Sequence, residues 1–182
     1  MKIEKQTLLN DLVEMTKNNI GKANQLLNNE FDILNLKEGD DIWSALECVE
    51  HLNRYAKFYT PELKTVLDNA KKDNDPIFRA GWIGNYFAKS MLHKPKLNKM
   101  KTFRDMNPSN SRLELDVISA FIEYQKDLLD ILSLAESISL TKNRTCITIS
   151  KILKLRIGDT LRVVVYHNER HLIQAIKATV SN

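Results

Sequence analysis

Apolar residues recur at steps of three and four along four long segments of this chain, the spacing that places them on one face of an α-helix. The segments cover residues 3–28, 42–59, 109–137 and 159–180. Only 5 glycines and 4 prolines occur among the 182 residues, so few positions force a turn. The pattern therefore predicts an all-α fold, an antiparallel four-helix bundle built as a single domain over residues 1–182.

The ends of the second helix are predicted from local signals. Asp40 or Asp41 is expected to cap its start, because a carboxylate accepts the free N–H groups of a first turn. Pro61 either ends this helix or opens a new helical turn, since proline fits the first position of a helix. Residues 61–73 then form a short continuation.

The connections between helices are less regular. Residues 73–110 are expected to form a long crossover between the second and third helices, passing over the end of the bundle. Thr145, Ile147 and Ile149 alternate with polar residues, which favours a brief extended stretch. Asp159 follows Gly158 and is expected to cap the last helix.

Composition excludes several classes of protein. The net charge is +4, and no run of five or six like charges appears, so we expect no nucleic-acid partner. No apolar stretch is long enough to span a bilayer and the N-terminus lacks a signal peptide, so we expect no membrane partner. Two cysteines are too few for a disulfide framework, and Cys48 is expected to be a buried free thiol. These features predict a cytoplasmic protein.

Two of the 4 histidines, His167 and His171, lie one turn apart in the last helix. Counting 100° per residue places His167, Val164 and Ala175 within about 40° of His171, so both imidazoles face the core. The opposite, outer side of this helix is expected to carry the following residues: Arg162, Tyr166, Glu169, Arg170 and Lys177.

An inward-facing histidine must satisfy two ring nitrogens, because an unpaired buried polar atom costs roughly 1–3 kcal/mol. A shared metal ion can satisfy one nitrogen of each ring, and hydrogen bonds to neighbours are the alternative. His51 lies at the edge of the apolar face of the second helix, where it is either a third ligand or a surface residue. Three neutral imidazoles with room for water are typical of a catalytic metal site. His93 is expected on the surface.

Two segments of the chain resemble the signatures of the DinB/YfiT-like superfamily. IWSALECVEHLNRY resembles its "W-S…E-H-L" helix, and LRVVVYHNERHLIQAI resembles its closing "L…H-x-x-x-H-x-x-Q" helix. KMKTFRDMNP resembles the loop that many members have before the third helix. The resemblance implies a four-helix bundle, often a homodimer, that holds one divalent ion, nickel or zinc, between His51, His167 and His171. It also implies an activity such as metal-dependent hydrolysis, S-transfer from a small thiol such as bacillithiol, or mycothiol-dependent isomerisation.

Two further residues are weaker catalytic candidates. Glu47 lies one turn before His51 and can orient its imidazole or act as a base, although a solvated carboxylate is the simpler interpretation. Asn168 lies on the apolar side of the last helix, either beside the site or in a core hydrogen bond, and the core bond is favoured. Gln174 follows the histidine pair on their own side and can do either. Trp43 and Trp82 are expected to be packing residues.

Three functional hypotheses follow from these residues. The first is a metal-dependent enzyme, a hydrolase or a small-thiol S-transferase, that acts on a small-molecule substrate, with a low-molecular-weight thiol as one class. The second is a non-catalytic metal-binding or stress-related protein, whose metal site is closed by a fourth protein ligand. The third is a helical bundle without a metal, in which the histidines form only hydrogen bonds.

Overall fold

The computed structural model describes residues 1–39, 41–92, 102–148 and 150–180. These residues form mostly helix, with two short antiparallel strand pairs, β1–β2 and β3–β4. The elements follow the chain in this order: β1 (Lys2–Glu4), α1 (Lys5–Leu26), α2 (Phe31–Asn35), α3 (Ala45–Asn69), β2 (Ile77–Arg79), α4 (Trp82–Met91), the 3₁₀ turn η1 (Arg104–Met106), α5 (Asp116–Ala135), β3 (Arg144–Ile147), β4 (Ser150–Arg156) and α6 (Ile157–Val180).

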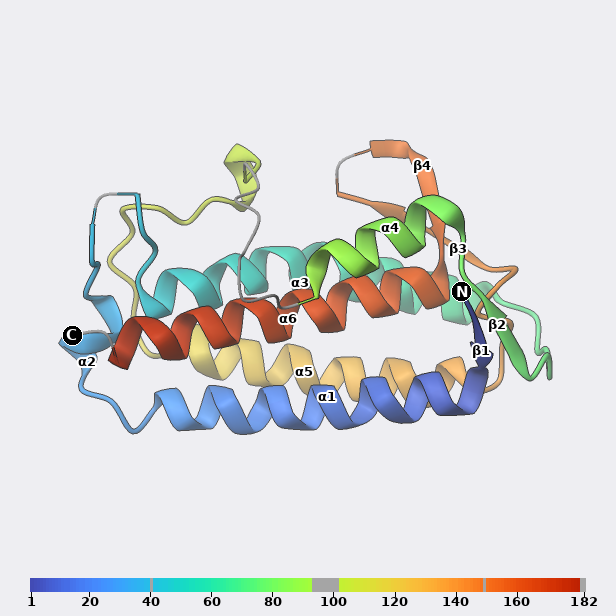
Figure 1. The fold of residues 1–182 in the computed structure, drawn as a ribbon, viewed down its shortest axis with the longest axis horizontal. Helices are drawn as coiled ribbons and strands as arrows, with labels where there is room; N and C mark the ends of the chain where they lie inside the picture. Colours follow the sequence, from blue (N-terminus) through green and yellow to red (C-terminus); the bar gives the residue numbers. More distant parts are fainter. Residues whose placement is uncertain (40, 93–101, 149, 181–182) are drawn as a thin grey trace.

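Four long helices, α1, α3, α5 and α6, lie side by side along the long axis of the molecule (Figure 1). Helices α1 and α3 each pack against both α5 and α6. The predicted predominance of helix is therefore confirmed, and the extended stretch predicted around Thr145 and Ile147 is strand β3. Strand β4, which pairs with it, was not predicted from the sequence. None of the described helices combines the length and the apolar character that crossing a membrane requires.

Helix α3 begins later than the sequence suggested, and the helical continuation expected after Pro61 belongs to the same helix, which ends at Asn69. Its N-cap is Ser44, whose Oγ accepts the Glu47 backbone N–H (3.1 Å) while a Glu47 carboxylate oxygen accepts the Ser44 N–H (3.0 Å). Asp41 lies before this capping box, and Asp40 is outside the described residues. Pro61 lies inside the helix rather than at its end. Buried side chains on both sides of Pro61 pack into the core, and this packing outweighs the one backbone hydrogen bond that proline removes.

The connection between α3 and α5 crosses the end of the long helices at β2, which pairs with β1, and then runs back along α6 (Figure 1). Its helix α4, which the sequence did not reveal, packs against α6 (Figure 1). Arg162 and Arg170, expected on the outer side of the last helix, are consequently buried beneath this connection. Arg170 donates to the backbone carbonyl of Ser90 (3.0 Å). For these two arginines the expectation of an exposed outer face was wrong, because periodicity within one helix carries no information on a second helix that covers it, whereas Lys177 is exposed as expected.

Asp159 holds α4 against α6 instead of capping α6. It lies inside the first turn of α6 and is fully buried. Its carboxylate accepts the Gly81 backbone N–H (2.7 Å) and pairs with Arg162 (3.2 Å). Gly84 lies directly over it, because a Cβ atom there would come within 2.5 Å of an Asp159 oxygen. The close approach of the two helices therefore requires glycine at this position.

The core consists of two apolar clusters, one in each half of the long helices. The first cluster, towards β1 and the β3–β4 hairpin, contains these residues: Leu8, Leu9, Leu12, Tyr59, Leu63, Leu67, Phe78, Leu128, Ile131, Leu132, Ala135, Ile138, Leu140, Ile157, Leu161 and Val165. The second, towards α2, contains these: Ala23, Leu26, Leu34, Ala45, Leu46, Cys48, Val49, Leu52, Val117, Ile118, Phe121, Leu172 and Ala175. Cys48 is buried and forms no disulfide, as predicted.

Candidate metal centre

A buried polar layer separates the two apolar clusters. In α6 it consists of His167 and Asn168, which lie between Val165 of the first cluster and Leu172 of the second. In α5 the buried Gln125 occupies the same level, and the Asn168 amide donates to its side-chain oxygen (3.1 Å). Buried polar groups are retained only where they are bonded or bind something, so this layer is the natural place for a functional site.

The three histidines expected to bind metal come together in this layer. One ring nitrogen from each of His51, His167 and His171 lies within 4.8 Å of the others. The Nε2 atoms of His51 and His167 are 3.2 Å apart. His51 is only 2 % exposed, which resolves its ambiguous position at the edge of a helical face: it is a core residue and not a surface one. His93 lies outside the described residues.

Hydrogen bonds fix which nitrogen of two of these rings faces the others. His51 Nδ1 lies 2.7 Å from the backbone carbonyl oxygen of Met106, and His171 Nδ1 lies 3.0 Å from the Gln174 side-chain oxygen. Both partners are acceptors, so Nδ1 carries the hydrogen in each ring and Nε2 keeps its lone pair. The sequence left open whether Gln174 lies at the site or in a core hydrogen bond. In the structure it contacts the site through His171.

Burial keeps all three imidazoles neutral. Loss of solvent lowers the pKa of His51 to about 4 and that of His171 to about 3. The same cause, reinforced by the two neighbouring imidazoles, lowers the pKa of His167 well below its ordinary value. Neutral imidazole is the form that binds a metal ion, so at neutral pH the cluster presents ligands that need not first lose a proton.

Aromatic rings enclose the cluster. The Trp43 ring centroid lies 4.6 Å from that of His51, and the Tyr55 centroid lies 4.7 Å from that of His167. Burial raises the pKa of Tyr55 to about 12, so its hydroxyl remains a hydrogen-bond donor at neutral pH. Trp43 is the packing residue that the sequence predicted, whereas Trp82 is exposed at the surface of α4.

The two weaker catalytic candidates make structural contacts. Glu47 is buried rather than solvated as expected, and its carboxylate oxygens accept the backbone N–H groups of Ser44 and Asn110, the latter at 2.6 Å. Glu47 therefore links the start of α3 to the loop that precedes α5. Asn168 forms the core hydrogen bond to Gln125 that was the favoured interpretation. Neither residue belongs to the group of potential metal ligands among the described residues.

The chain matches no protein-family model, no curated protein and no solved structure.

The loop around η1 positions His51, a role that no residue pattern of the sequence indicates. Arg54, one turn after His51, donates to the backbone carbonyls of Asp105 (3.4 Å) and Asn107 (2.7 Å), and these residues flank Met106. Its Nε also pairs with Glu50 (2.9 Å). Arg54 thus anchors the backbone whose carbonyl receives the His51 N–H. A backbone acceptor has no residue signature, so only the chain path could reveal it.

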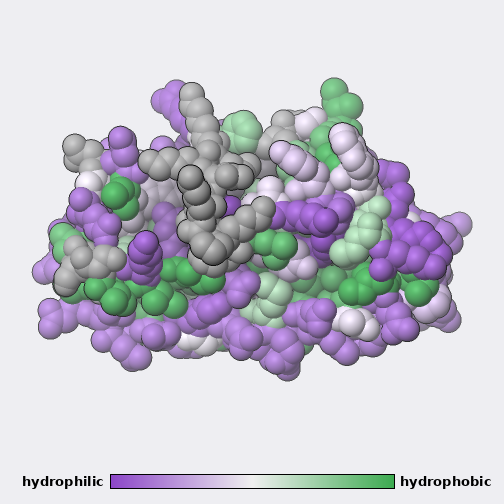
Figure 2. Space-filling view, viewed as in Figure 1, coloured by the Kyte–Doolittle hydropathy of each residue, from purple (hydrophilic) through white to green (hydrophobic). Residues whose placement is uncertain are grey.

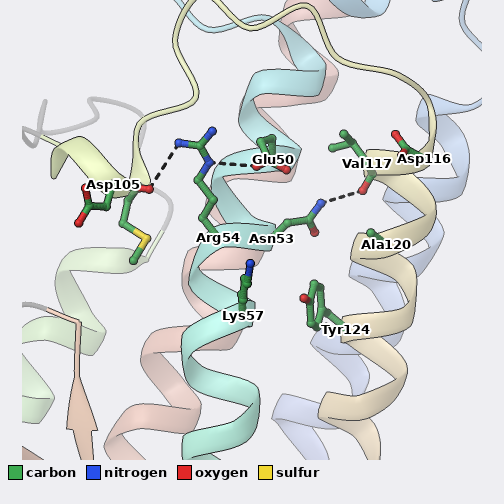
Figure 3. Close-up of a pocket in the computed structure, with 10 residues that line it drawn as sticks. Glu50, Asn53, Arg54, Lys57, Asp105, Asp116, Val117, Ala120 and Tyr124 are labelled. Atoms are coloured by element: carbon green, nitrogen blue, oxygen red, sulfur yellow. Dashed lines mark hydrogen bonds and ion pairs between the residues drawn. The ribbon is translucent and has the colours of Figure 1, made fainter.

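A cavity of about 550 Å³ lies beside this loop, between α3 and α5 (Figure 3). Its lining consists of Glu50, Asn53, Arg54, Lys57, Asp105, Met106, Asp116, Val117, Ala120 and Tyr124. None of the three histidines lines it, and the residues that it shares with the surroundings of His51 are Met106 and Arg54. The cavity is therefore a separate space from the histidine cluster.

Proposed function

We propose that this protein is a metal-dependent enzyme that binds one divalent ion between His51, His167 and His171. One observation carries the proposal: three neutral imidazoles converge at the centre of the helices, and two of them donate their other N–H to an oxygen. Metal-binding histidines characteristically have this second hydrogen bond, which orients the ring and fixes its tautomer.

The donor set fits a divalent ion of intermediate softness. Imidazole nitrogen suits nickel and zinc, which are the two metals we propose. Within the described part of the chain, no further histidine, cysteine or carboxylate joins the three histidines. Three protein ligands leave coordination positions for water or substrate, which favours a catalytic site over a closed structural one.

The fold supports the same assignment. We propose that the four long helices form a four-helix bundle of the DinB/YfiT-like type, with His51 contributed by the second long helix and the other two ligands by the last. Metal sites in bundles draw ligands from facing helices in this way. The proposal includes a homodimeric assembly, which the resemblance alone suggests.

The reaction is proposed to be hydrolysis or S-transfer from a low-molecular-weight thiol to a small electrophile. A bound divalent ion supplies a Lewis acid that activates water or a thiol at neutral pH. The chain's own residues hold and enclose the site: Met106 and Gln174 orient two of the ligands, while Trp43 and Tyr55 pack against the rings and limit access of bulk water.

Elemental analysis of protein purified without an affinity tag tests the proposal. We expect close to one nickel or zinc ion per chain, lost in His51→Ala, His167→Ala and His171→Ala. His93→Ala is the matched control and should retain the metal. A wild-type protein that carries no divalent ion and binds none on addition contradicts the proposal.

Spectroscopy of the cobalt-substituted protein then separates an enzyme from a structural metal protein. An open site should show spectral changes when azide or a small thiol is added, because a position is available for exchange. A spectrum that no added ligand alters indicates a closed site and contradicts the enzymatic part of the proposal.

A further inference from the structure

Acidic residues are missing from two stretches of the sequence, residues 76–104 and 137–158. Of the 27 lysines and arginines, seven lie in the first stretch and five in the second. The remaining 15 share the rest of the chain with all 23 aspartates and glutamates. The net charge of +4 is therefore the sum of two strongly basic segments and an otherwise acidic chain.

The fold brings the described parts of these segments to one side of the molecule. Helix α4 and the β3–β4 hairpin both lie above α6 in the view of Figure 1. They are in contact: α4 packs against β4, and the Arg156 guanidinium of β4 donates to the backbone carbonyl of Arg79, just before α4. Helix α4 and the β3–β4 hairpin thus form one surface, although residues 92–143 separate them in the chain.

The outer face of the hairpin concentrates positive charge. Arg144 of β3 is paired in register with Arg156 of β4, and Cys146 is paired with Lys154. Side chains directly opposite in an antiparallel pair project from the same face, so three cations share this face. Among the described residues, none of the three lies within ion-pair distance of a carboxylate. The Glu62 carboxylate bonds to Cys146 beside them, and the charge of Arg156 lowers the pKa of the buried Asp159, so both carboxylates offset part of this positive charge. Like charges placed opposite one another are destabilising, and an anionic partner would relieve the repulsion.

Large apolar side chains project from the same surface. Ile152, on the outer face of β4, is 94 % exposed, and in α4 Trp82 and Tyr86 are 89 % and 68 % exposed. Figure 2 shows hydrophobic atoms protruding over the hairpin, whereas the lower edge formed by α1 is mainly hydrophilic. Exposure of this extent, next to clustered cations, is the pattern of a surface that binds a partner.

We propose that this surface, formed by α4 and the outer face of the β3–β4 hairpin, docks on a membrane that contains anionic lipids. Its cations match the negative potential of such a membrane, and tryptophan, tyrosine and isoleucine partition into the region between headgroups and acyl chains. The exposed side chain of Ile152 favours a membrane over a nucleic acid as the partner. An aliphatic side chain neither stacks on a base nor bonds to its edge, whereas it gains from burial in lipid.

This inference departs from the sequence-based expectation of no membrane partner. That expectation considered spans long enough to cross a bilayer and runs of consecutive like charges. Peripheral docking requires neither, because a folded surface can gather charges that are dispersed along the chain. The inference also stands apart from the metal site, since no residue of the histidine cluster belongs to this surface.

Vesicle flotation with the full-length protein tests the inference. The protein should float with vesicles of phosphatidylcholine mixed with phosphatidylglycerol and should not float with phosphatidylcholine alone. The double variant Arg144→Glu/Lys154→Glu should weaken binding by roughly tenfold or more. The variant Lys17→Glu/Lys126→Glu is the matched control, because it changes the charge equally at exposed positions of α1 and α5 and should bind like wild type.

Two apolar variants test penetration into the membrane. Ile152→Ser should weaken binding, whereas Leu134→Ser, at an exposed position of α5, should not. Brominated phosphatidylglycerol should quench tryptophan fluorescence in wild type, and most of this quenching should disappear in Trp82→Phe.

Binding of the protein to labelled single-stranded and duplex oligonucleotides is measured at the same ionic strength, because nucleic acid is the competing partner. Binding to oligonucleotides without binding to anionic vesicles overturns the proposal in favour of a nucleic-acid surface. Equal binding to neutral vesicles overturns it as well, and so does unchanged vesicle binding by a correctly folded Arg144→Glu/Lys154→Glu variant, with folding checked by circular dichroism.

Discussion

The Nε2 atom of His51 lies 3.2 Å from the Nε2 atom of His167, although 116 positions separate the two residues in the chain. His51 donates its Nδ1–H to Met106, so its Nε2 can only accept. In the metal-free protein His167 must therefore carry the hydrogen between them. A neutral imidazole can move that hydrogen to its other nitrogen, which frees a second lone pair for a cation without a change of net charge. The pair is thus prepared to exchange one hydrogen bond for two metal bonds.

The metal-free protein should lose stability as the pH falls from about 6.5 towards 4. The folded-state pKa of each of the three histidines lies below the ordinary value, so the unfolded chain binds more protons over this range. Each histidine that stays neutral in the fold costs roughly 1.4 kcal/mol of stability per pH unit below its unfolded pKa. Above pH 6.5 the histidines are mainly neutral in both the folded and the unfolded chain, so this cost disappears. Urea unfolding of chelator-treated protein at several pH values measures the slope.

The triple variant His51→Gln/His167→Gln/His171→Gln is the control for this pH dependence. It should show a clearly flatter profile, because glutamine does not titrate. Equal slopes in the variant and in wild type would assign the pH dependence to other groups.

Arg54→Ala should weaken metal binding although Arg54 is not a ligand. Its guanidinium anchors the backbone on either side of Met106, and the Met106 carbonyl orients His51. Loss of an orienting group of this kind typically lowers metal affinity by about 10–100-fold. Competition with a chromophoric chelator measures the affinity. Arg112→Ala, which removes an exposed arginine paired with Asp32, should have no effect; equal affinity in wild type and Arg54→Ala would contradict the positioning role.

Two glycine-to-alanine substitutions should change stability in opposite directions. Gly84→Ala forces a methyl group against Asp159 and should destabilise the protein by about 1–3 kcal/mol. Gly21→Ala, inside α1 with no atom within 4 Å of the new methyl, should stabilise it by about 0.5–1 kcal/mol, because alanine favours helix. Chemical denaturation midpoints measure both. A stabilising effect of Gly84→Ala would contradict the close contact between Gly84 and Asp159.

Glu47→Ala should reduce stability and leave the metal in place. The substitution leaves the Asn110 N–H without its acceptor and removes half of the capping box, so a loss of about 1–3 kcal/mol is expected. Ser44→Ala removes the other half of the box and should cost about 1 kcal/mol. Metal content and denaturation are measured on the same preparations. A Glu47→Ala variant of normal stability that lacks activity would restore Glu47 as a catalytic candidate.

The sequence by itself determined the features that depend on one helix at a time. The repeat of apolar residues located four long helices, and the same periodicity turned His167 and His171 towards the core. The spacing of two residues on a helix follows from its geometry alone, so no other part of the chain was needed.

Only the tertiary structure decided what distant segments do to one another. It buried His51, placed the Met106 carbonyl beside it, and covered Arg162 with α4. It also carried α3 straight through Pro61, because packing on both sides outweighed a local signal to stop. A backbone carbonyl has no residue signature, and the free energy of packing is summed over segments far apart in the chain. Such features therefore do not appear in a local pattern.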